Sequence, residues 1–283
     1  MDGSIGVYDN SYSRFSDHVY EEIRGETYGV DLGQTGWMTA NEYRGFLDLL
    51  SLTSASRVLE IGCGAGGCAL YLARTVGAEV IGIDINENGI RNARTLADSA
   101  GAESRLHFER VDASEGLPFP TESFDAVFSN DAVCHIANRL QLLKECRRVL
   151  KPGGRVLFTD ALVITGAVSN EEIAMRSSIG YYVFVPGGEN ERLIAAAGLD
   201  LLSITDLTTS AAEISERWRD ARARRRESLV QIECEPNFLV LQEFLACVHS
   251  LADERRLSRF MYLCWRPDTA SADPAFLIGS ASV

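Results

Sequence analysis

Positive charge is scarce in this chain of 283 residues. It carries 27 lysines and arginines against 40 aspartates and glutamates, which gives a formal net charge of −13 and an isoelectric point near 4.8. A protein that binds nucleic acid needs a basic surface, and so does one held on a membrane mainly by anionic lipid. We therefore expect neither nucleic acid nor membrane among the partners, and a small neutral or cationic ligand fits the charge better.

Metal-binding cysteine patterns and long apolar runs are also missing. The seven cysteines form no Cys-x-x-Cys pair and no His/Cys cluster with zinc spacing, so no metal site is expected. Their odd number and scattered positions are typical of a reducing compartment, which predicts a cytoplasmic protein. The first residues lack the basic and apolar segments of a signal peptide, and the longest apolar stretch, 237–252, is too short and polar to span a membrane.

Strand and helix patterns alternate regularly after residue 57. Strands are expected at 57–61, 79–83, 106–111, 124–129 and 155–160, with helices between them at 67–76, 86–100 and 138–150. This order, with short apolar strands, predicts an α/β fold. We expect a Rossmann-like, doubly wound, mostly parallel sheet of seven strands with helices on both faces.

A glycine-rich turn follows the first expected strand, in Val58-Leu59-Glu60-Ile61-Gly62-Cys63-Gly64-Ala65-Gly66-Gly67. Glycines permit a tight turn and let a ligand lie against bare backbone. Asp84 closes the second strand, where a carboxylate can accept both hydroxyls of a ribose. The loop and Asp84 together predict an adenosine-containing ligand. The pattern GxxxxGK[ST] is absent, which excludes a P-loop nucleotidase, whereas the loop alone leaves a dinucleotide-dependent dehydrogenase open.

Further ordered segments extend this pattern. They are Val111-Asp112-Ala113, Leu117-Pro118-Phe119, Phe124-Asp125-Ala126-Val127 and Leu150-Lys151-Pro152-Gly153-Gly154. With the glycine loop and Asp84, they resemble the class I S-adenosylmethionine-dependent methyltransferases over roughly residues 55–165. The resemblance implies S-adenosyl-L-methionine as cofactor.

The same resemblance implies roles for individual residues. The glycine loop with Gly62, Gly64 and Gly67 would hold the amino-acid part of the cofactor, Asp84 the ribose, and Asp112 and Ala113 the adenine. Asn130 would lie near the methionine end and the substrate. Glu60 suits a cationic cofactor electrostatically. Alternatively, Glu60 only orders the loop, and Asp112 is a helix cap.

The remaining residues divide the chain around this core. Residues 1–50 are expected to form an N-terminal helical lid, with Thr39 as an N-cap, and 51–165 the cofactor-binding core. A substrate cap with the late sheet elements is expected over 166–257, and the last strand and a tail over 258–283. The cap is expected to be helical because about fifty residues separate two late strands. All four segments would form one integrated domain.

Residues before and within the core resemble the phosphoethanolamine and sarcosine/dimethylglycine N-methyltransferase branch. These are Tyr12 and Tyr20 near the start, and Asp131 and His135 after the fourth expected strand. The resemblance implies that Tyr12 and His135 close the site and assist proton removal, while Tyr20 and Asp131 line the amine. His135 has a suitable intrinsic pKa for a base. Alternatively, the tyrosines are core contacts on one helix face, and His135 is a hydrogen-bonded residue at a helix start.

The chain departs from that branch where a phosphate would bind. The segment 177–186 is apolar and aromatic, and it lacks an Arg-x-Tyr element, so a phosphate would need Arg176 or Arg259 as its clamp. A more hydrophobic or aromatic acceptor is expected, lined by Tyr181 and Tyr182, unless these rings pack the cap onto the sheet.

The sequence therefore predicts an S-adenosylmethionine-dependent methyltransferase that acts on a small molecule, with N-methylation of an amine as the expected reaction. O- or C-methylation of a small natural-product-like acceptor stays open. So does a non-catalytic S-adenosylmethionine-binding protein, because a fold does not prove turnover.

Overall fold

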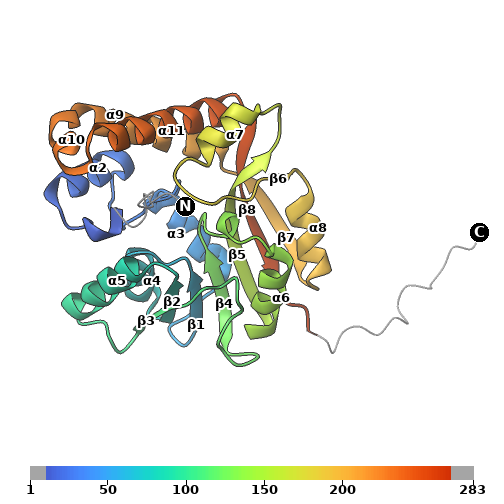
Figure 1. Ribbon diagram of the computed structural model, residues 1–283. Coiled ribbons are helices and arrows are strands. Elements are labelled where there is room, and N and C mark those ends of the chain that lie inside the picture. Colours follow the sequence, from blue (N-terminus) through green and yellow to red (C-terminus); the bar gives the residue numbers. More distant parts are fainter. Residues whose placement is uncertain (1–10, 269–283) are drawn as a thin grey trace, which may run out of the picture.

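One sheet runs through the part of the chain that the computed structural model describes, residues 11–268 (Figure 1). Seven strands are ordered β3-β2-β1-β4-β5-β8-β7, and a short β6 pairs with β5. They are β1 (Arg57–Ile61), β2 (Glu79–Asp84), β3 (Leu106–Arg110), β4 (Phe124–Ser129), β5 (Leu150–Ile164), β6 (Val185–Pro186), β7 (Asp200–Asp206) and β8 (Leu257–Trp265). The predicted doubly wound, mostly parallel sheet is confirmed. Residues 1–10 of the expected lid and 269–283 of the expected tail lie outside the described residues.

The sheet has a parallel part and an antiparallel part. Strands β1 to β5 pair in parallel, with Leu59 opposite Ile81 on one side and Val127 on the other. Strand β8 runs antiparallel to both β5 and β7. The central strands are apolar along almost their whole length because both of their faces are covered by helices.

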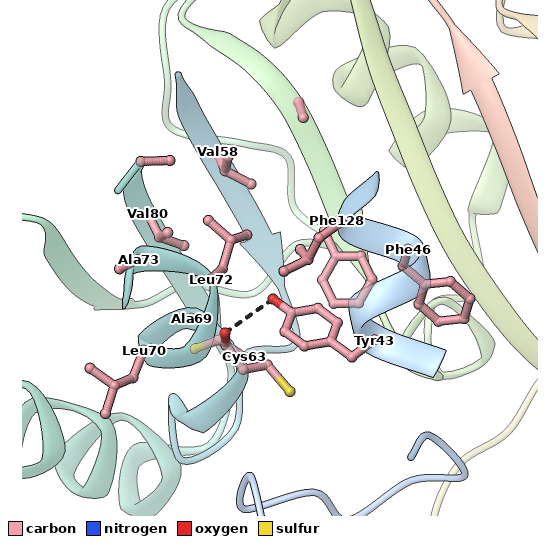
Figure 2. Packing of buried hydrophobic residues seen from close by; sticks show 14 of the residues in the cluster. Tyr43, Phe46, Val58, Cys63, Ala69, Leu70, Leu72, Ala73, Val80 and Phe128 are labelled. Atoms are coloured by element: carbon pink, nitrogen blue, oxygen red, sulfur yellow. Dashed lines mark hydrogen bonds between the residues drawn. The ribbon is translucent and has the colours of Figure 1, made fainter. Parts of the chain in front are cut away.

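Two sets of helices cover the faces of the sheet. One set is α3 (Ala40–Leu50), α4 (Gly67–Val76) and α5 (Glu87–Ala100), and the other is α6 (Arg139–Val149) and α8 (Glu189–Ala196). In the first set the buried Tyr43 hydroxyl donates a 3.0 Å hydrogen bond to the carbonyl oxygen of Cys68, as Figure 2 shows. The Tyr43 ring also packs 5.2 Å from the ring of Phe128, so one side chain joins α3 to α4 and β4.

A third group of helices lies together beyond one end of the sheet (Figure 1). It consists of α2 (His18–Tyr28), α7 (Asn170–Arg176), α9 (Thr208–Arg224), α10 (Arg226–Glu233) and α11 (Glu235–Asp253). Ion pairs join α2 to the arginine-rich α9, since Glu26 pairs with both Arg224 and Arg225. Hydrogen bonds from these two arginines lower the pKa of Glu26 to about 2. The helix group therefore links the start of the chain to its last third.

Three segments differ from the pattern read in the sequence. Strand β5 begins at Leu150, which pairs with Phe124 before a bulge, and it ends at Ile164 rather than at residue 160. The glycine and proline positions in 161–190 predict an irregular segment, but this segment contains α7, which Ser169 caps. The spacing of apolar residues over 211–231 predicts one helix, but the structure has two, α9 and α10, with the break at Arg225. The sequence pattern does not show the break, because one helical spacing continues across it. No described helix is long and apolar enough to cross a membrane.

Candidate functional site

The glycine loop joins β1 to α4 through backbone that other residues rarely adopt. Gly62 has φ +76°, and a Cβ added there would lie 2.4 Å from the Cβ of Ala132. Gly64 has φ +51°. Gly67 opens α4, and a Cβ there would lie 2.0 Å from the carbonyl oxygen of Leu32. The loop thus presents bare backbone at the carboxyl end of β1, where a ligand can approach closely. Of the three predicted glycines, Gly62 lines the adjoining cavity.

Asp84 lies at the carboxyl end of β2, beside the loop. Its Oδ2 accepts a 2.9 Å hydrogen bond from the amide of Gly64, and its Oδ1 accepts one of 2.8 Å from the amide of Asn86. Burial raises the pKa of this carboxyl. Asp84 therefore braces the glycine loop and also lines the cavity, the position predicted for the ribose.

The next carboxylate, Asp112, follows β3. Its Oδ1 accepts hydrogen bonds from the amide and hydroxyl of Ser114, at 2.9 and 2.6 Å. Asp112 and Ala113 both line the cavity next to Asp84. The carboxyl ends of β2 and β3 thus supply one continuous wall, as expected for ribose and adenine at this edge of a doubly wound sheet.

Glu60 is buried within β1, directly before the glycine loop, and does not line the cavity surface. Its Oε2 has no hydrogen-bond partner among the described residues. Burial, and then the charge of Asp84, raise the pKa of Glu60 to about 8. A buried carboxyl group without a partner is costly, so a cationic ligand in the loop would stabilise its ionised form.

A cavity of about 390 Å³ opens in front of these strand ends. Its far wall is built from α7, the loop after α7, α9 and α11. The side chains there are mostly apolar or aromatic: Ile179, Tyr181, Tyr182, Trp218, Leu241 and Phe244. Trp37, from the segment before α3, and Ala161, from β5, complete this wall. The predicted Tyr181 and Tyr182 are thus both at the cavity. We call the part of the cavity beside the strand ends, where the sequence predicts the cofactor, the cofactor end, and the part beside the far wall the acceptor end.

His135 stands between these two ends, in a 3-10 helix, η1 (Val133–His135), that follows β4. Its Nδ1 lies 2.8 Å from the carbonyl oxygen of Tyr181, and its ring centroid lies 4.6 Å from that of Tyr182. Burial lowers the pKa of His135, so the imidazole is neutral at pH 7. A carbonyl oxygen can only accept, so Nδ1 carries the proton and Nε2 is the basic nitrogen.

Asp131 and Asn130, which follow β4, also line the cavity, but a buried arginine holds both. Nε of Arg259 donates to Asp131 Oδ1 at 2.9 Å, and Nη2 donates to Asn130 Oδ1 at 2.9 Å. Asp131 Oδ2 accepts a further 2.9 Å bond from the amide of Trp37. Arg259 therefore has a positioning role that the sequence pattern did not reveal, and the Asp131 carboxylate is already neutralised by protein groups.

Tyr12 lies over the glycine loop. A Cβ added to Gly64 would lie 2.4 Å from the Tyr12 hydroxyl oxygen, and Asn92 Nδ2 donates to the Tyr12 carbonyl oxygen at 2.7 Å. The hydroxyl oxygens of Tyr12 and Thr35 are 3.2 Å apart. The Tyr12 hydroxyl thus lies next to that of Thr35, while Nδ1 of His135 lies next to the carbonyl oxygen of Tyr181.

Tyr20 does not line the cavity, which corrects the sequence expectation. Its hydroxyl donates a 2.6 Å bond to Oε1 of the buried Glu233, which also pairs with Arg222. Because α2 packs against α9, the face that carries Tyr20 turns toward the cap and away from the cavity. Tyr20 is a core residue of the lid–cap contact.

The sequence predicts no role for Arg176, at the end of α7, other than that of a substitute phosphate clamp. Arg176 lines the acceptor end, with only 2% of its surface exposed. Its guanidinium carbon lies 4.8 Å from the ring centroids of both Tyr182 and Phe244. No cluster of three metal-binding side chains occurs among residues 11–268.

The sheet and the cofactor end define the class of protein. A glycine loop after β1 and carboxylates after β2 and β3 are typical of Rossmann-like enzymes that bind an adenosine-containing cofactor. The antiparallel β8 beside β5 departs from the all-parallel order 3-2-1-4-5-6 of dinucleotide-binding folds.

Comparison with known proteins narrows the class to a family. A family model described as a methyltransferase domain matches residues 59–158. Methyltransferase GfsG of Streptomyces halstedii is 32% identical over 202 residues, which cover 69% of this chain and 70% of that protein. The 27-O-demethylrifamycin SV methyltransferase of Amycolatopsis mediterranei is 30% identical over 230 residues, 78% of this chain and 80% of that enzyme. The chain therefore belongs to the S-adenosylmethionine-dependent methyltransferases that act on small molecules.

A second group of similar proteins is longer than this chain. Phosphoethanolamine N-methyltransferase 3 of Arabidopsis thaliana is 29% identical over 231 residues, 78% of this chain but only 45% of that enzyme. The chain thus spans less than half the length of this relative. A phosphoethanolamine N-methyltransferase 2 of Haemonchus contortus, solved with phosphomonomethylethanolamine and S-adenosylhomocysteine, superposes with a TM-score of 0.76 at 22% identity, over 92% of this chain and 60% of that one. This likeness shows the fold.

The cofactor is S-adenosylmethionine, and the residues present fit it. The orphaned carboxyl of Glu60 behind the loop suits a cationic amino acid, and the bare backbone at Gly62 suits a close approach. Asp84 suits a ribose and the Asp112–Ala113 pair an adenine. Bound in this way, the cofactor supplies an electrophilic methyl group to the acceptor end.

Proposed function

We propose that the protein methylates a hydroxyl oxygen of a planar, largely apolar small molecule. The observation that carries this proposal is the tautomer of His135. A hydrogen bond to the Tyr181 carbonyl oxygen assigns the proton to Nδ1, and burial keeps the ring neutral, so Nε2 is basic at neutral pH. A hydroxyl group is a weak nucleophile until a base takes its proton, and a neutral imidazole at the cavity suits that task.

The mechanism follows from the positions of these side chains. The acceptor lies between the aromatic side chains of the far wall, and its hydroxyl points toward the cofactor end. His135 Nε2 would take the proton of the attacking hydroxyl group, and S-adenosylmethionine held at the cofactor end would supply the methyl group to the hydroxyl oxygen, with its sulfur as the leaving atom. Tyr12, in its lid position, limits the access of water to the reacting groups. We further propose that residues 11–50 act as the lid and 166–257 as the substrate cap.

An amine acceptor, which the sequence resemblance favoured, finds less support in this cavity. An alkylammonium ion entering the site needs a carboxylate or unoccupied aromatic faces. The Asp131 carboxylate is already engaged by Arg259 and Trp37, and the rings of Tyr182 and Phe244 already face the guanidinium of Arg176. N-methylation remains the second candidate because similar proteins include N-methyltransferases.

A matched acceptor panel tests the proposal. Each planar apolar scaffold is offered as a hydroxyl compound and as the corresponding amine, with S-adenosylmethionine, and products are separated by mass spectrometry. We expect O-methylated products whose formation falls about 10²–10⁴-fold in His135→Asn. Exclusive N-methylation would refute the hydroxyl proposal. If S-adenosylhomocysteine binds but no member of the panel is methylated, the result contradicts the hydroxyl proposal and favours a non-catalytic S-adenosylmethionine-binding protein.

A further inference from the structure

Arg176 occupies an aromatic box inside the acceptor end of the cavity. It is the last residue of α7, and its guanidinium carbon lies 4.8 Å from the ring centroids of Tyr182 and Phe244 and 5.8 Å from that of Trp37. The three rings come from the loop after α7, from α11 and from the segment before α3. They hold the guanidinium at the cavity and shield it from solvent, so that 2% of the residue is exposed.

The charge of Arg176 is not matched by an acidic side chain in the part of the chain that the structure describes. Neither Nε nor Nη1 has a hydrogen-bond partner, and no ion pair to Arg176 forms within residues 11–268. The carboxylates of nearby elements are engaged elsewhere, Asp131 with Arg259 and Glu172 with Arg256. A buried guanidinium that makes no ion pair is unfavourable. Buried donors without partners are rare in proteins, and each calls for an explanation. Because Arg176 lines the cavity, a ligand there could supply the missing acceptor.

We propose that Arg176 recognises the acceptor by binding a planar anionic oxygen group on it, either a carboxylate or an ionised phenol or enol. The inference rests on the proposed methyl transfer to a small molecule and names the substrate class more closely. The fork of an arginine matches such planar groups, and the aromatic box holds it ready. Both His135 and Arg176 lie against the ring of Tyr182. The acceptor would thus place its anionic group at Arg176 and its reacting hydroxyl at His135.

This arrangement also fits the electrostatics at the reacting end. The positive charge of Arg176 contributes to the lowered pKa of His135, after the larger effect of burial. An acceptor anion at Arg176 would offset that contribution, so the bound acceptor would make the imidazole a better proton acceptor. The opposite charge on a ligand, an ammonium ion, would meet repulsion from Arg176 in the same place.

Binding, measured by calorimetry on the full chain saturated with S-adenosylhomocysteine, tests this proposal without any methyl transfer. Two probe pairs keep shape nearly constant and change charge: 2-naphthoate with 2-naphthamide, and 2,4-dinitrophenolate with 2,4-dinitroanisole. The variants are Arg176→Met, Arg176→Lys and, as a control for net charge, Arg192→Met on the exposed surface of α8. Because no turnover is needed, failure here is distinguishable from failure of the hydroxyl proposal.

We expect at least one anion to bind roughly tenfold or more tightly than its neutral partner. Arg176→Met should abolish this preference, Arg176→Lys should keep part of it, and Arg192→Met should leave it unchanged. The pair that shows the preference identifies the anionic group as carboxylate or phenolate. Equal binding within both pairs, or an undiminished preference in Arg176→Met, would overturn the proposal.

Thermal melting separates recognition from a purely structural role. An apolar side chain of similar length in a box of three rings replaces an unpaired buried charge, so Arg176→Met should leave the melting temperature unchanged or raise it. The dissociation constant for S-adenosylhomocysteine should stay the same. A lowered melting temperature with an intact anion preference would make Arg176 a structural anchor and contradict the assignment.

Discussion

Nδ1 of His135 lies 2.8 Å from the carbonyl oxygen of Tyr181, which ties the short helix after β4 to the loop after α7. The contact joins the cofactor end of the cavity to its acceptor end through one imidazole ring. It also fixes which nitrogen of that ring is basic.

Activity should therefore be flat around neutral pH and fall on the acid side. Burial lowers the pKa of His135 below its ordinary value of 6.5, so the ring becomes protonated only at a pH below that value. The pH profile of kcat/KM measures the acid limb directly. In His135→Asn the limb should disappear and activity should fall by about 10²–10⁴-fold. An acid limb that persists in this variant would assign the titration to another group.

Binding of the cofactor should release a proton near pH 7. Glu60 has a pKa of about 8 in the unliganded protein because it is buried, and a cation in the glycine loop would favour its ionised form. Calorimetry with S-adenosylhomocysteine in buffers of different ionisation enthalpy measures the proton. Glu60→Gln should abolish the release and weaken binding, whereas unaltered proton release would place its source elsewhere.

Glu60→Gln should also change how the free energy of unfolding depends on pH. The folded pKa of Glu60 lies above the ordinary value of 4.5, so the wild-type protein loses stability as the pH rises from 4.5 through about 8. Glu60→Gln removes this loss, on the order of a few kcal/mol at pH 9. Melting temperatures at pH 5 and pH 9 should therefore converge in the variant. If the melting temperature depends on pH equally in the wild-type protein and in Glu60→Gln, the raised pKa of the buried Glu60 carboxyl is refuted.

Loss of the Asp84 carboxylate should weaken cofactor binding. Charge-assisted hydrogen bonds contribute about 1.5–3 kcal/mol each, so Asp84→Asn should raise the dissociation constant for S-adenosylhomocysteine roughly 10–100-fold. Asp98→Asn on the exposed side of α5 is the matched control. If both variants bind equally well, Asp84 serves the loop and not the ribose.

A methyl group at Gly64 should disturb the lid as well as the loop. A Cβ there would lie 2.4 Å from the Tyr12 hydroxyl oxygen, so Gly64→Ala should weaken S-adenosylhomocysteine binding roughly tenfold. Gly101→Ala controls for backbone strain, because Gly101 has φ +60° and nothing within 4 Å of an added Cβ. In the double variant with Tyr12→Ala the loss should be smaller than the sum of the single losses. If the two single losses of binding simply add in the double variant, Tyr12 does not act together with the loop, and its lid role is refuted.

Tyr20 should matter for stability and not for the acceptor. Glu233→Ala leaves Arg222 buried without its partner, which costs about 3–5 kcal/mol and lowers the melting temperature by roughly 10 °C. Tyr20→Phe removes one hydrogen bond to Glu233 and costs about 1 kcal/mol. Both should leave KM for the acceptor unchanged once folded. A raised KM for the acceptor in Tyr20→Phe would indicate that Tyr20 contacts the acceptor after all.

The cofactor end could be predicted because its determinants are local in the chain. The loop after β1 and the residue that ends β2 are fixed by strand boundaries and turn chemistry, and these can be read from glycine and apolar patterns. The predicted Gly62, Asp84, Asp112 and Ala113 line the cavity accordingly.

The acceptor end could not be read in the same way, because long-range packing assembles it. Tyr20 matches a binding-site pattern, yet the docking of α2 onto α9 turns its hydroxyl to Glu233, 213 residues away in the chain. The surroundings of Arg176 depend on three rings that come from separate parts of the chain. A local sequence pattern cannot predict that an arginine packs against aromatic side chains instead of pairing with a carboxylate.

The two walls of the cavity have a further consequence for the evolution of this chain. The residues at the cofactor end follow β1 to β4, whereas most of the acceptor wall belongs to α7, the loop after it, α9 and α11. Substitutions in the acceptor wall can therefore leave the residues of the cofactor end unchanged. Chimeras that exchange the α7 and α9–α11 segments between relatives offer a direct route to methylation catalysts with new acceptor ranges.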